Sequence, residues 1–189
     1  MGKFNTIYVN NIVFDNNILT MKEDYFLLQL YRWSNKEGIA KPELATIQKY
    51  LKVSKRTICR YEKKLIDNNF IDKIRPFEYQ LLHLADTKKG NFTMLEKSLI
   101  EDPSNSIYNI MLYCHLCRLA DNQGIIAISL EKLKKRVKCR INNLTDSLDY
   151  WNNLGLVKKT KIKSNKNKFY YNKYIVYNLA KEDNYIDDI

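Results

Sequence analysis

The sequence predicts a mostly helical α+β fold in which two similar units follow one another, each ending in a small β-hairpin. The first observation is an internal repeat, because the chain aligns with itself when shifted by 86 residues, without a gap from about Thr6 to Ile71. The second is that each copy has three segments with apolar residues at helical spacing, followed by an apolar pair typical of a strand. The length of 189 residues suits two small domains.

The repeat preserves the chemical character of its positions as well as their spacing. Agreement by chance at so many apolar positions is improbable, although helical periodicity alone accounts for part of the agreement. The turn after the first helix is also repeated, with a glycine at its fourth residue in both copies. The clearest correspondences are Leu30 with Leu116, Leu44 with Leu130, Ile47 with Leu133, Ile58 with Leu144, Leu65 with Trp151, and 35–39 with 121–125.

Each copy contains the same order of elements. A short extended segment precedes a first helix, a turn, a second short helix, a tight turn, a third helix and an apolar pair that begins a hairpin. We expect these over 7–9, 22–34, 43–51, 54–68 and 70–71 in the first copy, and over 92–94, 106–120, 130–137, 140–153 and 156–157 in the second. This order is the winged-helix plan, so the sequence predicts two tandem winged-helix domains. We place them at 1–80 and 92–180, with a linker over 81–91 and an acidic tail over 181–189.

The charge of the chain indicates a polyanionic partner. Lysine and arginine outnumber aspartate and glutamate by 32 to 21, which gives a net charge of +11. No apolar stretch is long enough to span a bilayer, and the first residues do not resemble a signal peptide, so we expect no membrane partner. Without an export signal, the four cysteines favour a reduced, cytoplasmic setting over disulfides.

The third helix of the first copy carries the most specific pattern, over 51–61. Ser54 is placed to cap this helix, and Ile58 and Leu65 share the face expected to pack on the core. The opposite face is cationic, as a recognition helix in a major groove requires. Arginine can bind guanine with two parallel hydrogen bonds, whereas lysine and threonine suit phosphates. The predicted DNA-contacting residues are Lys55, Arg56, Thr57, Arg60, Lys63 and Lys64.

One position departs from this pattern. Glu62 falls on the side where a helix-turn-helix usually has an apolar residue, so we expect Tyr61 to take over part of that packing. Surface helices also carry lysine and arginine for solubility alone. The cap, the turn and the preceding helix in register favour DNA binding over this alternative.

Two parts of the sequence resemble known protein families. The segment 44–71 resembles the helix-turn-helix of winged-helix proteins from plasmids and phages of low-GC Gram-positive bacteria. The second half, with its segments 92–94, 99–102 and 168–179, is similar to the amino-terminal domain of plasmid replication initiator A proteins. The resemblance implies a DNA-binding protein of a mobile element. It does not fix the role, because winged helices serve repressors, initiators and architectural proteins alike.

The third helix of the second copy has a different surface. Leu144, Leu148 and Trp151 are expected to face inward, and Asp146 and Asp149 to face outward together with Asn142 and Asn153. Two outward aspartates repel phosphates, which makes this helix a poor copy of the first. Asn142 remains a candidate for contacting adenine.

The cations of the second copy lie on other elements. Its second helix and the following turn contain Lys134, Lys135, Lys138 and Arg140, and its predicted hairpin contains Lys159, Lys161, Lys163, Lys166 and Lys168. A hairpin rich in lysine suits contact with the phosphate backbone or entry into a narrow, AT-rich minor groove. A merely solvated loop is the alternative.

Signals for other chemistry are weak. The segment 114–117, Cys-His-Leu-Cys, has zinc-like spacing, but it falls on an apolar first helix and lacks a second pair of ligands. We therefore expect no metal and no cofactor. The chain contains no glycine-rich phosphate loop, nucleophile elbow or metalloprotease motif, so we expect that it is not an enzyme.

These observations lead to one main hypothesis and one rival. The main hypothesis is a double-stranded DNA-binding protein of a mobile genetic element, acting in transcription regulation or replication initiation as a monomer or homodimer. The rival is a protein-interaction module that docks a replication or segregation partner through the second domain. The sequence leaves open the operator sequence, the process and the oligomeric state.

Overall fold

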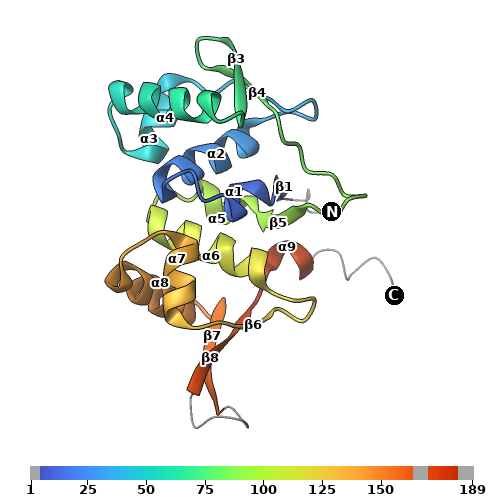
Figure 1. Ribbon diagram of the computed structural model, residues 1–189, viewed down its shortest axis with the longest axis vertical. Coiled ribbons are helices and arrows are strands. Elements are labelled where there is room, and N and C mark those ends of the chain that lie inside the picture. Colours follow the sequence, from blue (N-terminus) through green and yellow to red (C-terminus); the bar gives the residue numbers. More distant parts are fainter. Residues whose placement is uncertain (1–4, 164–169, 183–189) are drawn as a thin grey trace.

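A computed structural model describes residues 5–163 and 170–182 of the chain. It is a mixed α+β structure in which the helices are accompanied by small antiparallel sheets of two or three strands. The two halves of the chain lie one above the other, and a two-stranded sheet made of one strand from each half lies between them (Figure 1).

The first half contains a helical layer and a three-stranded sheet. The sheet has the order β2-β4-β3 and is antiparallel throughout. The elements are β1 Thr6–Asn10, α1 Ile12–Asp15, α2 Met21–Trp33, β2 Ile39–Ala40, α3 Leu44–Leu51, α4 Lys55–Asp67, β3 Ile71–Arg75 and β4 Glu78–Leu81. The three helices expected for this half, over 22–34, 43–51 and 54–68, are confirmed, each within two residues of the predicted bounds.

The second half repeats this order of elements. Its sheet has the order β6-β8-β7, in which each strand takes the place of its counterpart in the first half. The elements are β5 Phe92–Glu96, α5 Lys97–Glu101, α6 Ile107–Leu119, β6 Ile125–Ala127, α7 Leu130–Val137, α8 Ile141–Asn153, β7 Val157–Lys163 and β8 Tyr170–Val176. A final short helix, α9 Leu179–Glu182, lies against β5.

Equivalent turns in the two halves have the same backbone conformation. The glycine after the first long helix has a φ of +79° at Gly38 and +75° at Gly124, in the left-handed region that favours glycine. The turn before α4 and the turn before α8 each contain a left-handed lysine, with φ of 52° at Lys52 and 56° at Lys138. The internal repeat of the sequence is therefore a repeat of the backbone as well.

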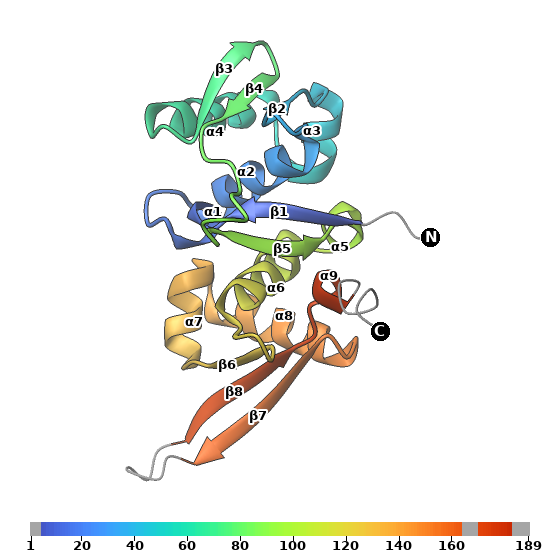
Figure 2. The same cartoon turned by 90° about the vertical axis from the view of Figure 1, so that its right-hand side faces the viewer.

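The central sheet relates the two halves by an approximate two-fold rotation. Strands β1 and β5 are antiparallel, and Tyr8 pairs with Met94, its own counterpart in the repeat (Figure 2). On either side of this pair the partners are exchanged, since Ile7 pairs with Leu95 and Val9 pairs with Thr93. Identical elements that pair with one another in this way form the contact of a two-fold dimer, here within one chain.

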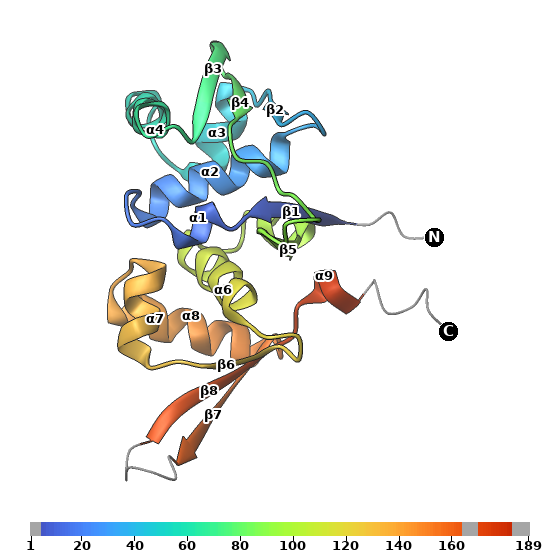
Figure 3. The ribbon, with the colours of Figure 1, turned by 45° about the vertical axis from the view of Figure 1, so that its right-hand side comes forward.

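This rotation places equivalent elements of the two halves on one side of the molecule. Helices α3 and α4 and helices α7 and α8 lie on the side away from α9 in Figure 1, and the view in Figure 3 is consistent with this arrangement. The hairpin β3–β4 and the hairpin β7–β8 lie at opposite ends (Figure 3). A single face therefore presents α4 from one half and α8 from the other.

The buried apolar side chains of the two halves belong to one continuous core, and the first long helices, α2 and α6, pack together where the halves meet. Ile58 and Leu65 of α4 are buried against the first half, and Leu144, Leu148 and Trp151 of α8 against the second. Their inward orientation was expected from helical periodicity and is confirmed. Burial of these side chains fixes which face of α4 and of α8 remains exposed.

Candidate nucleic-acid interface

Helix α4 begins at a side-chain cap. The Ser54 hydroxyl accepts a hydrogen bond from the Thr57 backbone N–H at 3.3 Å, as expected from the sequence. The residue before it, Val53, is half-buried and packs against the core. The cap and this contact fix the first turn of α4, which is the turn that carries Lys55 and Arg56.

The exposed face of α4 is cationic. Lys55, Arg56, Arg60 and Lys63 are all exposed. Arg56, Arg60 and Lys63 lie opposite the buried Ile58 and Leu65, and Lys55 flanks them at the start of the helix. The Arg60 guanidinium lies 5.6 Å from the centre of the Tyr61 ring. These four side chains form a row of cations along more than two turns of the helix, which we call the α4 face.

Two residues predicted to contact DNA have other partners. The Thr57 side chain is half-buried, and its hydroxyl lies 3.2 Å from the Ser54 hydroxyl. The Lys64 ammonium donates to Glu23 Oε2 at 2.8 Å, and the same oxygen accepts the Thr20 backbone N–H at 2.7 Å. Burial of Glu23 raises its pKa, but Lys64 and Thr20 outweigh this effect and the pKa is lowered. Lys64 therefore joins α4 to α2, at the edge of the α4 face.

The irregular position Glu62 is explained by an ion pair. Its side chain is 6% exposed, and Oε1 lies 2.7 Å from the ammonium of Lys73 on β3. Tyr61, which was expected to take over apolar packing at this point, is also buried. A carboxylate in an apolar helical position thus connects α4 to the hairpin that follows it.

Helix α8 presents no cationic row. Its exposed positions are Asn142, Asp146, Asp149 and Asn153, as the sequence predicted, together with Asn152. Three hydrogen bonds hold its other side against the second half: Trp151 Nε1 donates to Asn109 O at 2.7 Å, the Ser147 hydroxyl donates to Asn109 Oδ1 at 2.8 Å, and the Tyr150 hydroxyl donates to Asn105 Oδ1 at 2.7 Å. This anchoring fixes the acidic face outward.

The repeat pairs each cation of the α4 face with a neutral or acidic residue of α8. Arg56 corresponds to Asn142, Arg60 to Asp146 and Lys63 to Asp149. The two helices therefore differ in charge at the positions where they are most exposed. They do not differ in how they are buried.

The cations of α7 and of the turn before α8 are divided between solvent and ion pairs. Lys135 and Arg140 are exposed. Lys134 is half-buried and lies 3.1 Å from Glu131 on its own helix. Arg136 is exposed and donates to Asp15 of the first half at 2.8 Å, and Arg118 donates to the other oxygen of Asp15 at 2.7 Å.

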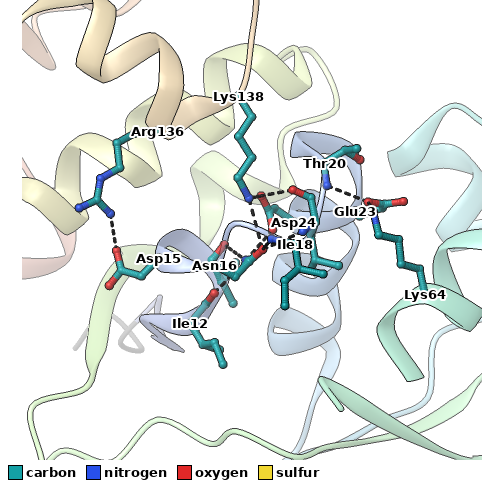
Figure 4. Close-up of polar contacts among 12 residues, drawn as sticks. Ile12, Asp15, Asn16, Ile18, Thr20, Glu23, Asp24, Lys64, Arg136 and Lys138 are labelled. Carbon is teal, nitrogen blue, oxygen red and sulfur yellow. Dashed lines mark hydrogen bonds and ion pairs between the residues drawn. The ribbon is translucent and has the colours of Figure 1, made fainter. Parts of the chain in front are cut away.

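Lys138, which the sequence analysis placed among the DNA-contacting residues, does not face solvent in the structure. Its side chain is only 18% exposed, and its ammonium donates three hydrogen bonds to the first half (Figure 4). The acceptors are Asp24 Oδ2 at 2.6 Å, Leu19 O at 2.9 Å and Asn16 Oδ1 at 3.3 Å. A lysine ammonium has three N–H donors, so these contacts use all of them. Lys138 belongs to the contact between the halves.

The hairpin β7–β8 carries lysine on both of its described strands. Lys159 and Lys161 are exposed and lie two residues apart, so they share one face of the strand. Lys163 is the last residue of β7, and Lys166 and Lys168 lie outside the described residues. The hairpin β3–β4 of the first half instead has equal numbers of acids and bases, namely Asp72, Lys73, Arg75 and Glu78.

The segment with zinc-like spacing lies inside α6. Cys114, His115 and Cys117 are all buried, as expected for an apolar first helix. Burial, together with Lys138 and Arg136, lowers the pKa of His115 to about 3, so its imidazole is neutral. Across residues 5–163 and 170–182, no three His, Cys, Asp or Glu side chains are grouped so as to hold a metal ion.

Three residues important to this region were not predicted from the sequence. Cys59 is exposed between Arg56 and Lys63 on the α4 face. The carboxylates of Asp15 and Asp24 form ion pairs with Arg136 and Lys138 of the second half. The position of Cys59 follows from helical periodicity, whereas no local signal marks the two aspartates, because acids are common near helix ends.

Comparison with known proteins gives no assignment. A scan against protein-family models finds no match, and a search of curated proteins finds no similar sequence. In the part of the chain that the structure describes, no helix combines the length and the apolar character needed to cross a bilayer.

Proposed function

We propose that this protein binds double-stranded DNA through two tandem winged-helix units, as a transcription regulator or replication initiator of a mobile genetic element. The observation that carries the proposal is the α4 face, where Lys55, Arg56, Arg60 and Lys63 are exposed on a capped helix whose opposite side is buried. This arrangement suits insertion into a major groove, with arginine on base edges and lysine on phosphates.

The two units contribute differently to binding. The first unit recognises sequence through Arg56 and Arg60 of α4. The second unit holds the phosphate backbone through Lys135 and Arg140 and through Lys159 and Lys161 of its hairpin, all of which are exposed. The acidic face of α8 repels phosphates, so we propose that α8 does not enter the DNA as α4 does.

A consequence is that the preferred site is not a palindrome. A symmetric dimer requires a symmetric operator because both recognition helices are identical. Here the two helices occupy equivalent places but differ at Arg56 and Asn142, and at Arg60 and Asp146. One chain then binds one specified half-site beside a stretch whose sequence matters little.

The experiment that tests the proposal is a binding titration with duplex DNA over a salt series, followed by selection from a random DNA pool. We expect log Kd to rise linearly with log salt concentration, with a slope of about 0.9 per phosphate neutralised. We expect the selected fragments to share a single non-palindromic motif. A flat salt response, with affinity no better than about micromolar, would instead support a protein-interaction module, for which the exposed Asp146 and Asp149 are the candidate surface.

A further inference from the structure

The contact between the two halves contains a polar cluster on the first turn of α2. Glu23 and Asp24 are adjacent residues there, both buried, and they bind lysines from different parts of the molecule (Figure 4). Glu23 holds Lys64 of α4, and Asp24 holds Lys138, which ends α7 and begins the turn into α8. One turn of α2 is therefore bonded to both of the helix-turn-helix segments.

The contact at Asp24 is the more enclosed of the two. Its side chain is 0% exposed, Oδ2 accepts from Lys138 and Oδ1 accepts from Asn16 Nδ2 at 2.9 Å. Asn16 is itself fixed, because its Nδ2 donates to Ile12 O and its Oδ1 accepts the Leu19 backbone N–H, both at 2.9 Å. Lys138 thus enters a preformed site of oxygen atoms at the end of α1.

A second ion pair lies on the same surface. Asp15 binds Arg136 of α7 and Arg118 of α6, with one carboxylate oxygen for each arginine. The C-terminal end of α7, and α6, the helix that precedes it, are therefore connected to the segment 15–24 of the first half. Such a set of charged hydrogen bonds defines one orientation, because each bond has narrow limits of distance and angle.

The equivalent place on the other side of the two-fold axis lacks these groups. Lys52 has the same left-handed conformation as Lys138 but is exposed, and the residue that corresponds to Asp24 is the apolar Ile110. Arg136 corresponds to Tyr50, whose ring lies 4.1 Å from the guanidinium carbon of Arg32 within the first half. The contact is therefore a specific addition to one side and not a by-product of the repeat.

We infer that Lys138 is a positioning residue for DNA binding: beside the β1–β5 pairing and the α2–α6 packing that join the halves, its bonds to Asp24, Leu19 and Asn16 hold helices α7 and α8 at one orientation relative to α4. The consequence of this inference rests on the proposed function: if the protein binds DNA, one chain contacts two parts of a DNA site at a fixed separation. Loss of the contact leaves each unit able to bind but no longer holds both in register.

The orientation of the units is tested first without DNA. Spin labels on the exposed Cys59 and on a second cysteine introduced by Asn153→Cys, with Cys139→Ser in the background, report the separation of α4 and α8 in the full chain. We expect a narrow distance distribution for the otherwise unchanged protein and for Lys52→Met, and a broad one for Lys138→Met. An unchanged distribution in Lys138→Met overturns the inference, whether or not the protein binds DNA.

The consequence for DNA is tested with the selected duplex and with duplexes in which one to three base pairs are inserted between its two contacted parts. We expect the insertions to weaken binding of the unchanged protein by about 100-fold, the order of gain from linking two sites, and to have little effect on Lys138→Met. A loss in Lys138→Met that is the same at every spacing indicates a merely structural residue and overturns the inference. Asp24→Asn, which keeps the shape and leaves no buried charge on Asp24, provides the same comparison if Lys138→Met does not fold.

Discussion

Helices α4 and α8 occupy equivalent places, yet they present opposite charges to solvent. Both bury an apolar stripe that includes Ile58 and Leu65 in one and Leu144 and Trp151 in the other. The cations that α4 carries on its exposed face are found in the second half on α7, on the turn before α8 and on the hairpin. The difference teaches that the buried positions of the repeat preserve the fold, whereas the exposed positions are free to differ in charge.

The largest effect is expected on the free energy of unfolding, at the turn before α8. The side chain of its lysine, Lys138, is only 18% exposed, whereas Lys52 in the equivalent turn before α4 is exposed. Lys138→Met leaves the Asp24 carboxylate at 0% exposure without its cation, and breaking a buried pair in this way costs about 3–5 kcal/mol in the free energy of unfolding. Lys52→Met changes an exposed side chain and should cost less than about 0.5 kcal/mol. Urea denaturation of both variants at pH 7.5 measures the difference, and equal losses would contradict it.

The same contact makes stability depend on pH. Burial, against the opposing effect of Lys138, raises the pKa of Asp24 from 3.8 to about 6, and Glu23 adds to the rise. The folded protein therefore binds this proton more tightly than the unfolded chain, so the contribution is full below pH 4 and is lost as pH rises through about 6. Relative to Asp24→Asn, the unfolding free energy should fall by about 2 kcal/mol between pH 4 and pH 7.

The pH series also has a clear contrary outcome. Asp24→Asn removes the titrating group but keeps the size of the side chain, so the difference between the two proteins isolates this one carboxyl. If the difference is independent of pH, or has the opposite slope, then the Lys138 ammonium outweighs the cost of burying Asp24. The contact would then stabilise the junction more strongly at neutral pH than we expect.

A smaller effect, on DNA affinity, is expected from substitutions on the exposed faces of α4 and α8. Arg56→Ala should weaken binding to the selected duplex by about 1–3 kcal/mol and relax the preference at one base pair. Asn142→Ala, at the equivalent position of α8, should change binding by less than about 0.5 kcal/mol. Competition binding with single-base variants of the duplex measures both. If Asn142→Ala costs as much as Arg56→Ala, both helices contact bases and the preferred site is closer to symmetric.

The sequence predicted the elements well because each is specified by neighbouring residues. Helix α7 has the predicted bounds, Leu130–Val137, since an apolar period and a cap at Ser129 lie within the same few turns. The orientation of α4 follows from the spacing of Ile58 and Leu65 in the same way. Arg56 and Arg60 are exposed because they lie on the side of the helix opposite these two buried residues.

The role of Lys138 was not predictable from the periodicity and caps of a single helix. It resembles its basic neighbours on α7 in type and spacing. Its contacts with Asp24, Leu19 and Asn16, all more than a hundred residues away, remove it from solvent. Asp24 itself lies in the first turn of a helix, where acids are common for local reasons. A contact between the halves depends on how they pack, and periodicity within one helix does not report that.

The smallest effect is expected from the hairpins, where Lys161 of β7 corresponds to Arg75 of β3 and both are exposed. Lys161→Ala should weaken binding to all sequences alike and lower the slope of log Kd against log salt concentration by about 1, because one phosphate contact is lost. Arg75→Ala should leave that slope nearly unchanged, since its hairpin has as many acids as bases. The slopes come from titrations of each variant with the selected and a random duplex. A uniform loss of the same size from Lys161→Ala and Arg56→Ala would mean that the two halves do not divide base recognition from backbone binding.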